Sequence, residues 1–253
     1  TGTEGIYGPA MNVSANYVAL FVLFGSLLEK FGGGELFVDL AYSLTGRMRG
    51  GPAKASVVSS ALMGTMSGSA VANVVTTGAF TIPLMKKNGY ASKVAGAVEA
   101  VASTGGQIMP PVMGAAAFLM AEVTGIPYSK IMVAALLPAF MYFLAIFLVV
   151  DLEALKMDIG KADDSQIKKV GAVLKHGGYL MIPLLLLIVL IFTGSRFFLH
   201  GLCPILAIAV FCFVLKDTHL GFATTFLCLI PVFIYACIYY MMVAVVGEEK
   251  GGW

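Results

Sequence analysis

The sequence contains few charged residues. Only 12% of its 253 residues are Asp, Glu, Lys or Arg, whereas 59% are hydrophobic, and an average soluble domain has about 25% charged residues. This scarcity of charge excludes an ordinary soluble domain and indicates an integral membrane protein. The formal net charge of +2 is too small for nucleic-acid binding. We therefore expect a lipid bilayer, and no nucleic acid, around this chain.

Histidine and cysteine are also scarce, with three and four residues. The cysteines lack C-x-x-C spacing, so neither a metal centre nor a disulfide framework is predicted. A Ser/His/Asp set, paired acids, an H-E-x-x-H motif and a phosphate-binding glycine loop are missing too, which argues against an intramembrane enzyme or an ATP-driven pump. The cysteines are expected to pack among apolar side chains and the histidines to lie at interfaces: Cys203, Cys212, Cys228, Cys237, His176, His200 and His219.

Long apolar runs dominate the rest of the sequence. A membrane-spanning helix needs about 20 mostly apolar residues, and several runs approach that length, which predicts an all-α polytopic membrane protein. A segment with apolar residues at helical spacing, 36–48, is predicted to lie in the interface plane. The polar segment 151–175 is expected to be a solvated cytoplasmic loop. The predicted spans are 12–28, 131–150, 179–192, 197–215 and 221–246.

Two basic clusters flank a segment that is too short for two full spans. Both clusters, at 47–54 and 86–93, belong on the cytoplasmic side by the positive-inside rule, which requires an even number of crossings between them. The apolar halves 55–66 and 70–85 would form helices of about 18 and 24 Å, shorter than the hydrocarbon core of about 30 Å. We therefore predict a re-entrant helical hairpin that turns at Ser67, Gly68 and Ser69.

The next apolar segment, 94–124, is interrupted by the sequence STGGQIMPP at 103–111. Adjacent glycines followed by two prolines cannot continue a helix, because proline lacks the amide donor and clashes with the preceding turn. Irregular backbone within a membrane has to be buried in protein or line a polar cavity. The sequence thus predicts a broken transmembrane helix whose break lies near the hairpin turn in the membrane interior.

Small polar residues gather at both interruptions. Neutral oxygens without a cluster of carboxylates suit a monovalent cation such as Na⁺ better than a transition metal. The helix after Ser69 also points its first amides inward, where they would stabilise an anionic carboxylate. Broken-helix secondary transporters place Na⁺ and an anion in this way. The polar residues are Ser67, Ser69, Asn73, Thr76 and Thr77 near the turn and Ser103, Thr104 and Gln107 at the break.

Two features of the sequence each allow a second interpretation. Gly64 and Gly68 form a G-x-x-x-G pattern that could serve only close helix packing, although this leaves Asn73 and the second break unexplained. Glu99 is either an intramembrane carboxylate that carries a cation or a proton, or a residue that snorkels to the cytoplasmic face or pairs with a lysine.

These segments resemble a known family. The stretches GTMSGSAVANVVTTGAFTIPLMKKNGY and AGAVEAVASTGGQIMPPVMGAAAFLMAE are similar to the DctM-like large membrane subunit of tripartite ATP-independent periplasmic (TRAP) transporters. The similarity is to the fused type, in which small and large membrane subunits share one chain. It is collinear over residues 5–155 and extends less specifically to 216.

The resemblance implies a Na⁺-coupled permease with an elevator-type, ion-transporter-superfamily fold in the inner membrane of a bacterium or archaeon. It would import small organic acids, C4-dicarboxylates or other carboxylates, delivered by a periplasmic substrate-binding protein, and would work with a small membrane subunit, fused or separate. Such a permease is not an enzyme, and it needs no cofactor apart from Na⁺ as the coupling ion.

The resemblance also implies an organisation and a site. Residues 1–52 would hold a scaffold helix and an arm helix, residues 53–125 half of the transport domain (hairpin 53–87, broken helix 94–124), and residues 126–253 further transmembrane helices. The substrate carboxylate would face Ser69, Asn73 and Thr77. The Na⁺ site would comprise Ser67, Gly68, Ser69, Asn73, Ser103, Thr104 and Gly105.

The sequence departs from the family in two respects. No second hairpin tip follows residue 155, and no small-subunit spans precede Thr1, so we expect a fragment with one of two inverted repeats. Two other functions stay open: a Na⁺/dicarboxylate or citrate carrier that works without a binding protein, and a non-transporting structural subunit of the membrane. An ion channel fits less well, because two breaks form a closed site more naturally than a continuous pore.

Overall fold

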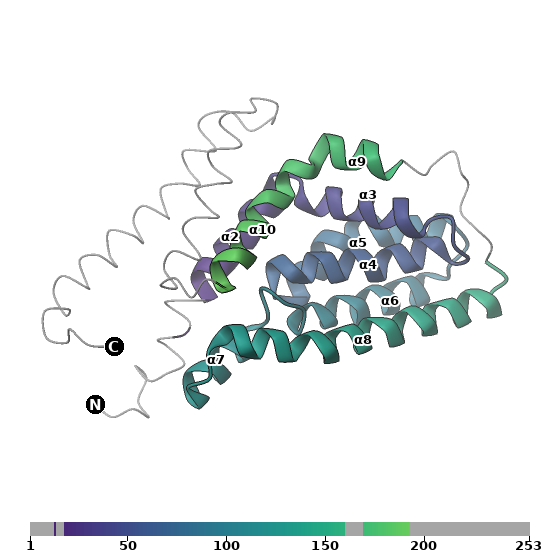
Figure 1. Cartoon of the computed structure of the whole chain (residues 1–253). Coiled ribbons are helices and arrows are strands. Elements are labelled where there is room, and N and C mark those ends of the chain that lie inside the picture. Colours follow the sequence, from purple (N-terminus) through teal and green to yellow (C-terminus); the bar gives the residue numbers. More distant parts are fainter. Residues whose placement is uncertain (1–12, 14–17, 160–168, 193–253) are drawn as a thin grey trace, which may run out of the picture.

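The structure is a computed structural model that describes residue 13 and residues 18–159 and 169–192. Within these residues the chain forms a bundle of helices without a strand, as Figure 1 shows. Helix α4 (Gly51–Ser67) is central, because it contacts α2, α3, α5, α6 and α8. The all-α prediction is thus confirmed for this part of the chain. Outside the described residues lie the predicted spans 197–215 and 221–246, the cysteines, His200 and His219.

Helices α2 (Ala19–Lys30) and α3 (Gly33–Thr45) form a helical hairpin. Gly32 joins them with a φ of 92°, a left-handed conformation that glycine adopts without steric cost. Helix α2 covers much of the predicted span 12–28 and continues to Lys30. Helix α3 corresponds to the predicted interfacial segment 36–48 but begins and ends three residues earlier. One of its faces, with Leu36 and Phe37, is buried in the bundle.

Helices α4 and α5 (Ala70–Lys87) form a second hairpin at the position predicted from the basic clusters. Pro52 lies in the first turn of α4, where its fixed φ favours helix initiation. Gly68 ends α4 with a φ of 57°, and the Ser69 hydroxyl then caps α5 by accepting a backbone N–H. The turn is as predicted, but α4 begins before the expected residue 55 and has 17 residues.

The predicted broken helix is present. Helix α6 (Ser92–Thr104) continues into a short 3₁₀ turn, η2 (Gly105–Gln107), and α7 (Ala115–Thr124) begins after an irregular segment at 108–114. The interruption contains the two glycines and two prolines that the sequence singles out.

Helix α8 (Tyr128–Lys156) is, among the described residues, the one helix long and apolar enough to cross a membrane, and α7 is a shorter apolar helix. It contains the predicted span 131–150 and extends beyond it at both ends. Its outer face displays large apolar side chains: Leu137 is 71% exposed and Phe140 is 64% exposed. A continuous apolar face of this kind suits contact with lipid or with other apolar helices.

The predicted polar loop 151–175 is too long. Helix α8 continues to Lys156, and α9 (Val170–Gly177), which contains His176, begins before the expected end of the loop. Charged residues do not stop a helix when they fall at favourable spacing, and Glu153 lies 3.9 Å from Lys156 in the last turn of α8. The 3₁₀ turn η4 (Gly178–Leu180) and helix α10 (Met181–Phe192) follow at the predicted span 179–192.

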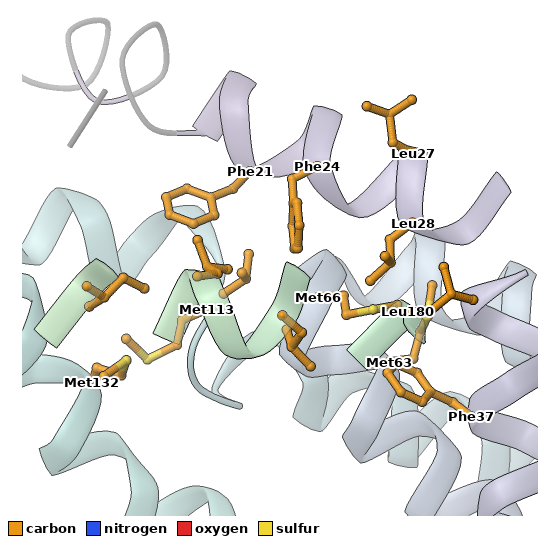
Figure 2. Packing of buried hydrophobic residues seen from close by; sticks show 14 of the residues in the cluster. Phe21, Phe24, Leu27, Leu28, Phe37, Met63, Met66, Met113, Met132 and Leu180 are labelled. Carbon is orange, nitrogen blue, oxygen red and sulfur yellow. The ribbon is translucent and has the colours of Figure 1, made fainter. Parts of the chain in front are cut away.

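Among the described residues, three apolar clusters stabilise the bundle, and two of them are large. The larger one joins α2, α3 and α4 with the 108–114 segment and α10, and Figure 2 shows Phe24, Leu28, Met63 and Met66 within it. Between helices in a membrane, such side chains stabilise the bundle through close van der Waals packing. The second cluster joins α4, α5, α6 and α8 and includes Val57. Between Val57 and Met63 the buried face of α4 is polar.

Candidate functional site

The turn of the α4–α5 hairpin contacts the break after α6. A Cβ atom added at Gly68 would lie 2.6 Å from the carbonyl oxygen of Met113 and 2.9 Å from that of Val112. The N–H of Val112 donates a hydrogen bond to the carbonyl of Thr65 at 3.3 Å. Backbone can approach backbone this closely only at glycine. The two interruptions predicted from the sequence therefore meet.

A second close approach lies on α4, one helical turn before Gly68. A Cβ atom on Gly64 would lie 2.5 Å from Cα of Gly106, and one on Gly106 would lie 2.9 Å from Nδ2 of Asn73. The G-x-x-x-G pattern of Gly64 and Gly68 thus does serve close packing. As a result of this close packing, α4 and Asn73 of α5 lie directly against the break.

Asn73 is fully buried and joins the two arms of the hairpin. Its Nδ2 donates to the carbonyl of Ser60 at 2.9 Å, and its Oδ1 lies 3.3 Å from the hydroxyl of Thr77. The amide nitrogen is thereby satisfied, as buried polar groups require, whereas the Thr77 hydroxyl has a shorter contact with Glu99.

A buried carboxylate lies at the centre of this region. Glu99 of α6 has no exposed surface, and hydroxyl groups from α4, α5 and α6 donate to it. Its Oε2 accepts at 2.6 and 2.5 Å from Ser56 and Thr81. Its Oε1 accepts from Thr77 and, at 3.0 and 3.3 Å, from Ser103 and Ser60. We call these residues the Glu99 cluster: Glu99, Ser56, Ser60, Thr77, Thr81 and Ser103.

Helical spacing explains why these groups converge. The cluster uses positions 56 and 60 of α4, 77 and 81 of α5, and 99 and 103 of α6, and residues four apart share one face of a helix. Gly78 makes room for the carboxylate, because a Cβ atom there would lie 3.1 Å from Cγ of Glu99. This repeated spacing is the sequence signal that could have identified Ser56, Ser60 and Thr81, which were not among the predicted site residues.

One interpretation of Glu99 is wrong. The residue neither snorkels to the surface nor pairs with a lysine, since it is fully buried and its hydrogen-bond donors are the hydroxyls described above. Lys93 lies six residues earlier, about 240° around the helix at 3.6 residues per turn. A buried charge without a cationic partner is costly, which makes Glu99 the strongest candidate for a functional residue here.

The remaining predicted site residues are distributed unevenly. Asn73, Thr77 and Ser103 come together at the buried cluster, as described above. Ser67 and Ser69 lie half-buried at the turn, where the N–H of Ser69 donates to the hydroxyl of Ser67 at 3.4 Å. Thr104 is exposed and donates to its own helix, at the carbonyl of Ala100. Gly68 and Gly105 are packing contacts, the latter against Tyr142 and Phe143 of α8.

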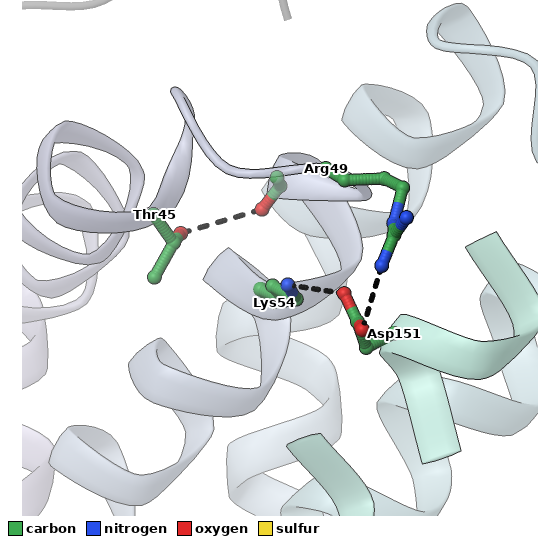
Figure 3. A network of polar contacts seen from close by, with 5 residues as sticks. Thr45, Arg49, Lys54 and Asp151 are labelled. Atoms are coloured by element: carbon green, nitrogen blue, oxygen red, sulfur yellow. Dashed lines mark hydrogen bonds and ion pairs between the residues drawn. The ribbon is translucent and has the colours of Figure 1, made fainter. Parts of the chain in front are cut away.

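A second charged cluster connects α4 to the end of α8, as Figure 3 shows. Asp151 accepts from Lys54 at 2.6 Å and from Arg49 at 3.0 Å. Lys54 is almost buried, and its ammonium also lies 5.0 Å from the centre of the Phe147 ring. Burial, together with the charges of Asp151 and Glu153, raises the pKa of the nearby Tyr90 to about 12. The charge of Asp151 is thus balanced within the chain, and the cluster is a structural contact.

Comparison with protein families matches residues 3–247 to the family described as tripartite ATP-independent periplasmic transporter, DctM component. The chain belongs to the DctM family. The resemblance to the DctM-like large membrane subunit is thereby confirmed, and the family consists of membrane transporter components rather than enzymes.

Curated relatives agree with this assignment. The DctM-family chain is 28% identical to YgiK of Salmonella typhimurium over 177 residues, which are 70% of this chain and 40% of YgiK. It is 35% identical to the C4-dicarboxylate TRAP transporter large permease protein DctM of Vibrio cholerae over 94 residues, 37% of this chain and 21% of that protein. It is 30% identical to the 2,3-diketo-L-gulonate TRAP transporter large permease protein YiaN of Escherichia coli over 126 residues, 49% and 29% of the two chains. The chain therefore spans less than half the length of these relatives.

Proposed function

We propose that this chain forms part of the membrane permease subunit of a Na⁺-coupled secondary transporter that imports small organic acids. The observation that carries the proposal is the contact between the hairpin turn at Gly68 and the break at Val112 and Met113. Helix ends that meet at two interruptions are the usual substrate and ion sites of secondary transporters. In this proposal the α4–α5 hairpin is re-entrant, and the hairpin and broken helix move as one unit of an elevator.

The substrate class is proposed from the family and from the site. Two relatives are named for a C4-dicarboxylate and for 2,3-diketo-L-gulonate, both organic acids. The start of α5 at Ser69 offers backbone N–H groups and a helix dipole to a carboxylate. Ser69 is half-buried and accessible there, whereas Asn73 and Thr77 support it from within the hairpin.

The partners follow from the same proposal. The family description is of a tripartite periplasmic transporter, so the permease receives its substrate from a periplasmic binding protein and works with a small membrane subunit. Its location is the inner membrane of a bacterium or archaeon, with the basic clusters at 47–54 and 86–93 facing the cytoplasm.

The test is uptake into proteoliposomes by the complete permease that contains this chain. Radiolabelled organic acids are supplied with and without the binding protein, and with and without an inward Na⁺ gradient. We expect uptake only when both are present. Na⁺-dependent uptake without the binding protein identifies the carrier of the alternative type, and no uptake or substrate binding under any of these conditions identifies a structural subunit.

A further inference from the structure

The Glu99 cluster has a charge without an internal counterion. Among the described residues, the groups that face Glu99 are the hydroxyls of α4, α5 and α6 and the backbone of Gly78. All of them are neutral. Lys54, which lies on α4 as well, directs its ammonium to Asp151 instead. A fully buried carboxylate in a membrane protein has a functional role by default, and its charge has to be balanced.

We propose that the Glu99 cluster is a Na⁺-binding site, in which the carboxylate balances the charge of the ion and the hydroxyl oxygens complete its coordination shell. The proposal rests on the Na⁺-coupled function proposed above. It adds an ion site at the arms of the hairpin, next to the turn and the break. The residues are Glu99, Ser56, Ser60, Thr77, Thr81 and Ser103.

The ligand set favours a monovalent metal ion over a proton. A proton on Glu99 would need one acceptor, whereas hydroxyl oxygens from three helices surround both carboxylate oxygens. Hard oxygen ligands suit hard cations, and a single carboxylate matches a single positive charge. The described residues contain no group of three or more His, Cys, Asp or Glu side chains that would select a divalent or transition metal.

The spacing of the oxygen atoms also fits an ion. The hydroxyl of Ser60 lies 3.5 Å from that of Thr77 and 3.5 Å from that of Ser103, longer than the usual hydroxyl hydrogen bond of about 2.7–2.8 Å. Oxygen ligands at about 2.4 Å from a hard cation stand about 3.4 Å apart when they are adjacent in an octahedron. The Ser60 hydroxyl thus has the separation of a neighbouring ligand from Thr77 and Ser103. Ser56 and Thr81, at 2.6 and 2.5 Å from Oε2 of Glu99, are in direct hydrogen-bond contact and move apart when an ion enters.

Two of the hydroxyls can change from donor to ligand when their hydrogens turn to a backbone carbonyl and their oxygen atoms draw back from the carboxylate to admit the ion. Thr77 also lies within hydrogen-bonding distance of the carbonyl of Asn73, at 2.7 Å, and Thr81 of the carbonyl of Thr77, at 3.0 Å. A hydroxyl has one hydrogen and two lone pairs. When its hydrogen turns to the backbone carbonyl, its lone pairs face the cluster and can bind the ion.

The cluster is linked to the proposed substrate side through Asn73. That side chain donates to the carbonyl of Ser60, its Oδ1 lies 3.3 Å from the hydroxyl of Thr77, and its Nδ2 lies against Gly106 at the break. Because the ligands come from both hairpin arms and from α6, a bound ion favours the arrangement in which the hairpin is seated on the break. Such a shift in population couples ion binding to substrate binding.

The test measures Na⁺ binding to the complete permease that contains this chain, purified in detergent. Na⁺ replaces choline at constant ionic strength, and binding is followed by radioactive Na⁺ and by the Na⁺-dependent rise in melting temperature. We expect Glu99→Gln to weaken apparent Na⁺ affinity at least tenfold and Ser60→Ala to weaken it several-fold. Ser59→Ala is the matched control, because Ser59 is equally buried on α4 but donates to the carbonyl of Ser56, and it should bind Na⁺ like the parent.

Different outcomes separate this inference from the proposed function. If the parent shows Na⁺-driven uptake while a folded Glu99→Gln variant keeps the parental Na⁺ affinity, the cluster is not the ion site. If uptake by the parent is driven by a pH gradient and not by Na⁺, and Glu99→Gln loses this uptake, the cluster is a proton site. That result overturns both this inference and the proposed Na⁺ coupling. If Glu99→Gln fails to fold, Na⁺ affinity is measured in Glu99→Asp and Ser60→Ala instead. Parental Na⁺ affinity in both variants contradicts the proposal.

Discussion

Glu99 and Asp151 are two carboxylates that differ in whether basic side chains of the same chain balance their charge. Asp151, near the end of α8, is half-buried and paired with Lys54 and Arg49. Glu99, on α6, is fully buried, and its hydrogen-bond donors are uncharged hydroxyls. A charge that is balanced within the chain holds elements together, whereas a buried charge that is not balanced leaves a place for something from outside.

Position in the bundle accounts for the difference. Asp151 follows the apolar part of α8, at the end where the basic residues of α4 begin, so cations are within reach. Glu99 lies seven residues into α6 from Ser92, opposite faces of α4 and α5 that contain serine and threonine instead of lysine. The first site is built for stability, and the second tolerates a cost in stability for function.

The largest expected effect separates the two carboxylates by function. Glu99→Gln should reduce Na⁺-stimulated uptake at least tenfold, because the neutral amide cannot balance the ion. Asp151→Asn should retain Na⁺ dependence, because its charge serves only the contact between α4 and α8. Initial uptake rates over a Na⁺ series in proteoliposomes measure both. If both variants lost Na⁺-stimulated uptake to the same extent, Glu99 and Asp151 would not differ in function.

A second prediction disturbs the Glu99 cluster without altering its side chains. Gly64→Ala should lower the free energy of unfolding by about 1–3 kcal/mol, since its Cβ would lie 2.5 Å from Cα of Gly106. Gly96→Ala is the matched control: that glycine is also helical but has no atom within 4 Å of an added Cβ, so a gain of about 0.5–1 kcal/mol is expected. Denaturant unfolding in detergent compares the two variants. If Gly64→Ala left the free energy of unfolding unchanged, the hairpin would not pack so closely against the break.

The third prediction concerns the stability of the balanced charge. Asp151→Asn should lower the melting temperature by about 5 °C, because it leaves the nearly buried Lys54 ammonium without its carboxylate. Glu153→Gln is the control, since the Lys156 side chain of that pair is 77% exposed and such pairs contribute little. Thermal unfolding followed by intrinsic fluorescence reports both, and equal melting temperatures would show that the Asp151 contact is not stabilising.

The smallest effect is expected at a third carboxylate. Glu29 of α2 accepts a hydrogen bond at 2.5 Å from Thr76 of α5, and both residues are partly exposed. Thr76→Val should lower the free energy of unfolding by about 0.5–1.5 kcal/mol and leave Na⁺ affinity unchanged. Thr104→Val, whose hydroxyl bonds only within its own helix, controls for the substitution. A change in Na⁺ affinity in Thr76→Val would extend the ion site towards α2.

Much of the fold could be predicted from local sequence. The turn at Gly68 and the break at 103–111 depend on glycine and proline, whose backbone preferences act locally. The predicted end of α8 was wrong by several residues, because the charged residues after Val150 tolerate a helix as well as a loop. Lys156 in the final turn also suits the helix dipole there.

The candidate site was only partly predictable. Asn73, Thr77 and Ser103 are marked by their polarity within apolar segments, and all three reach the buried cluster. Ser56 and Ser60 look like residues that merely allow close packing, and Thr104 looks like a ligand although it is exposed. A residue type shows what a side chain can bind, but its partners depend on which helix lies opposite.

The sequence by itself determined that this chain is a membrane protein, where its helices are interrupted and which residues share a helical face, because composition, backbone preference and helical period are local properties. Only the tertiary structure decided that positions 56, 60, 77, 81 and 103 surround Glu99. The physical reason is that the close approach of Gly64 to Gly106 and the room left by Gly78 set how α4, α5 and α6 pack. Burial of a charge is a property of that contact and not of any one helix.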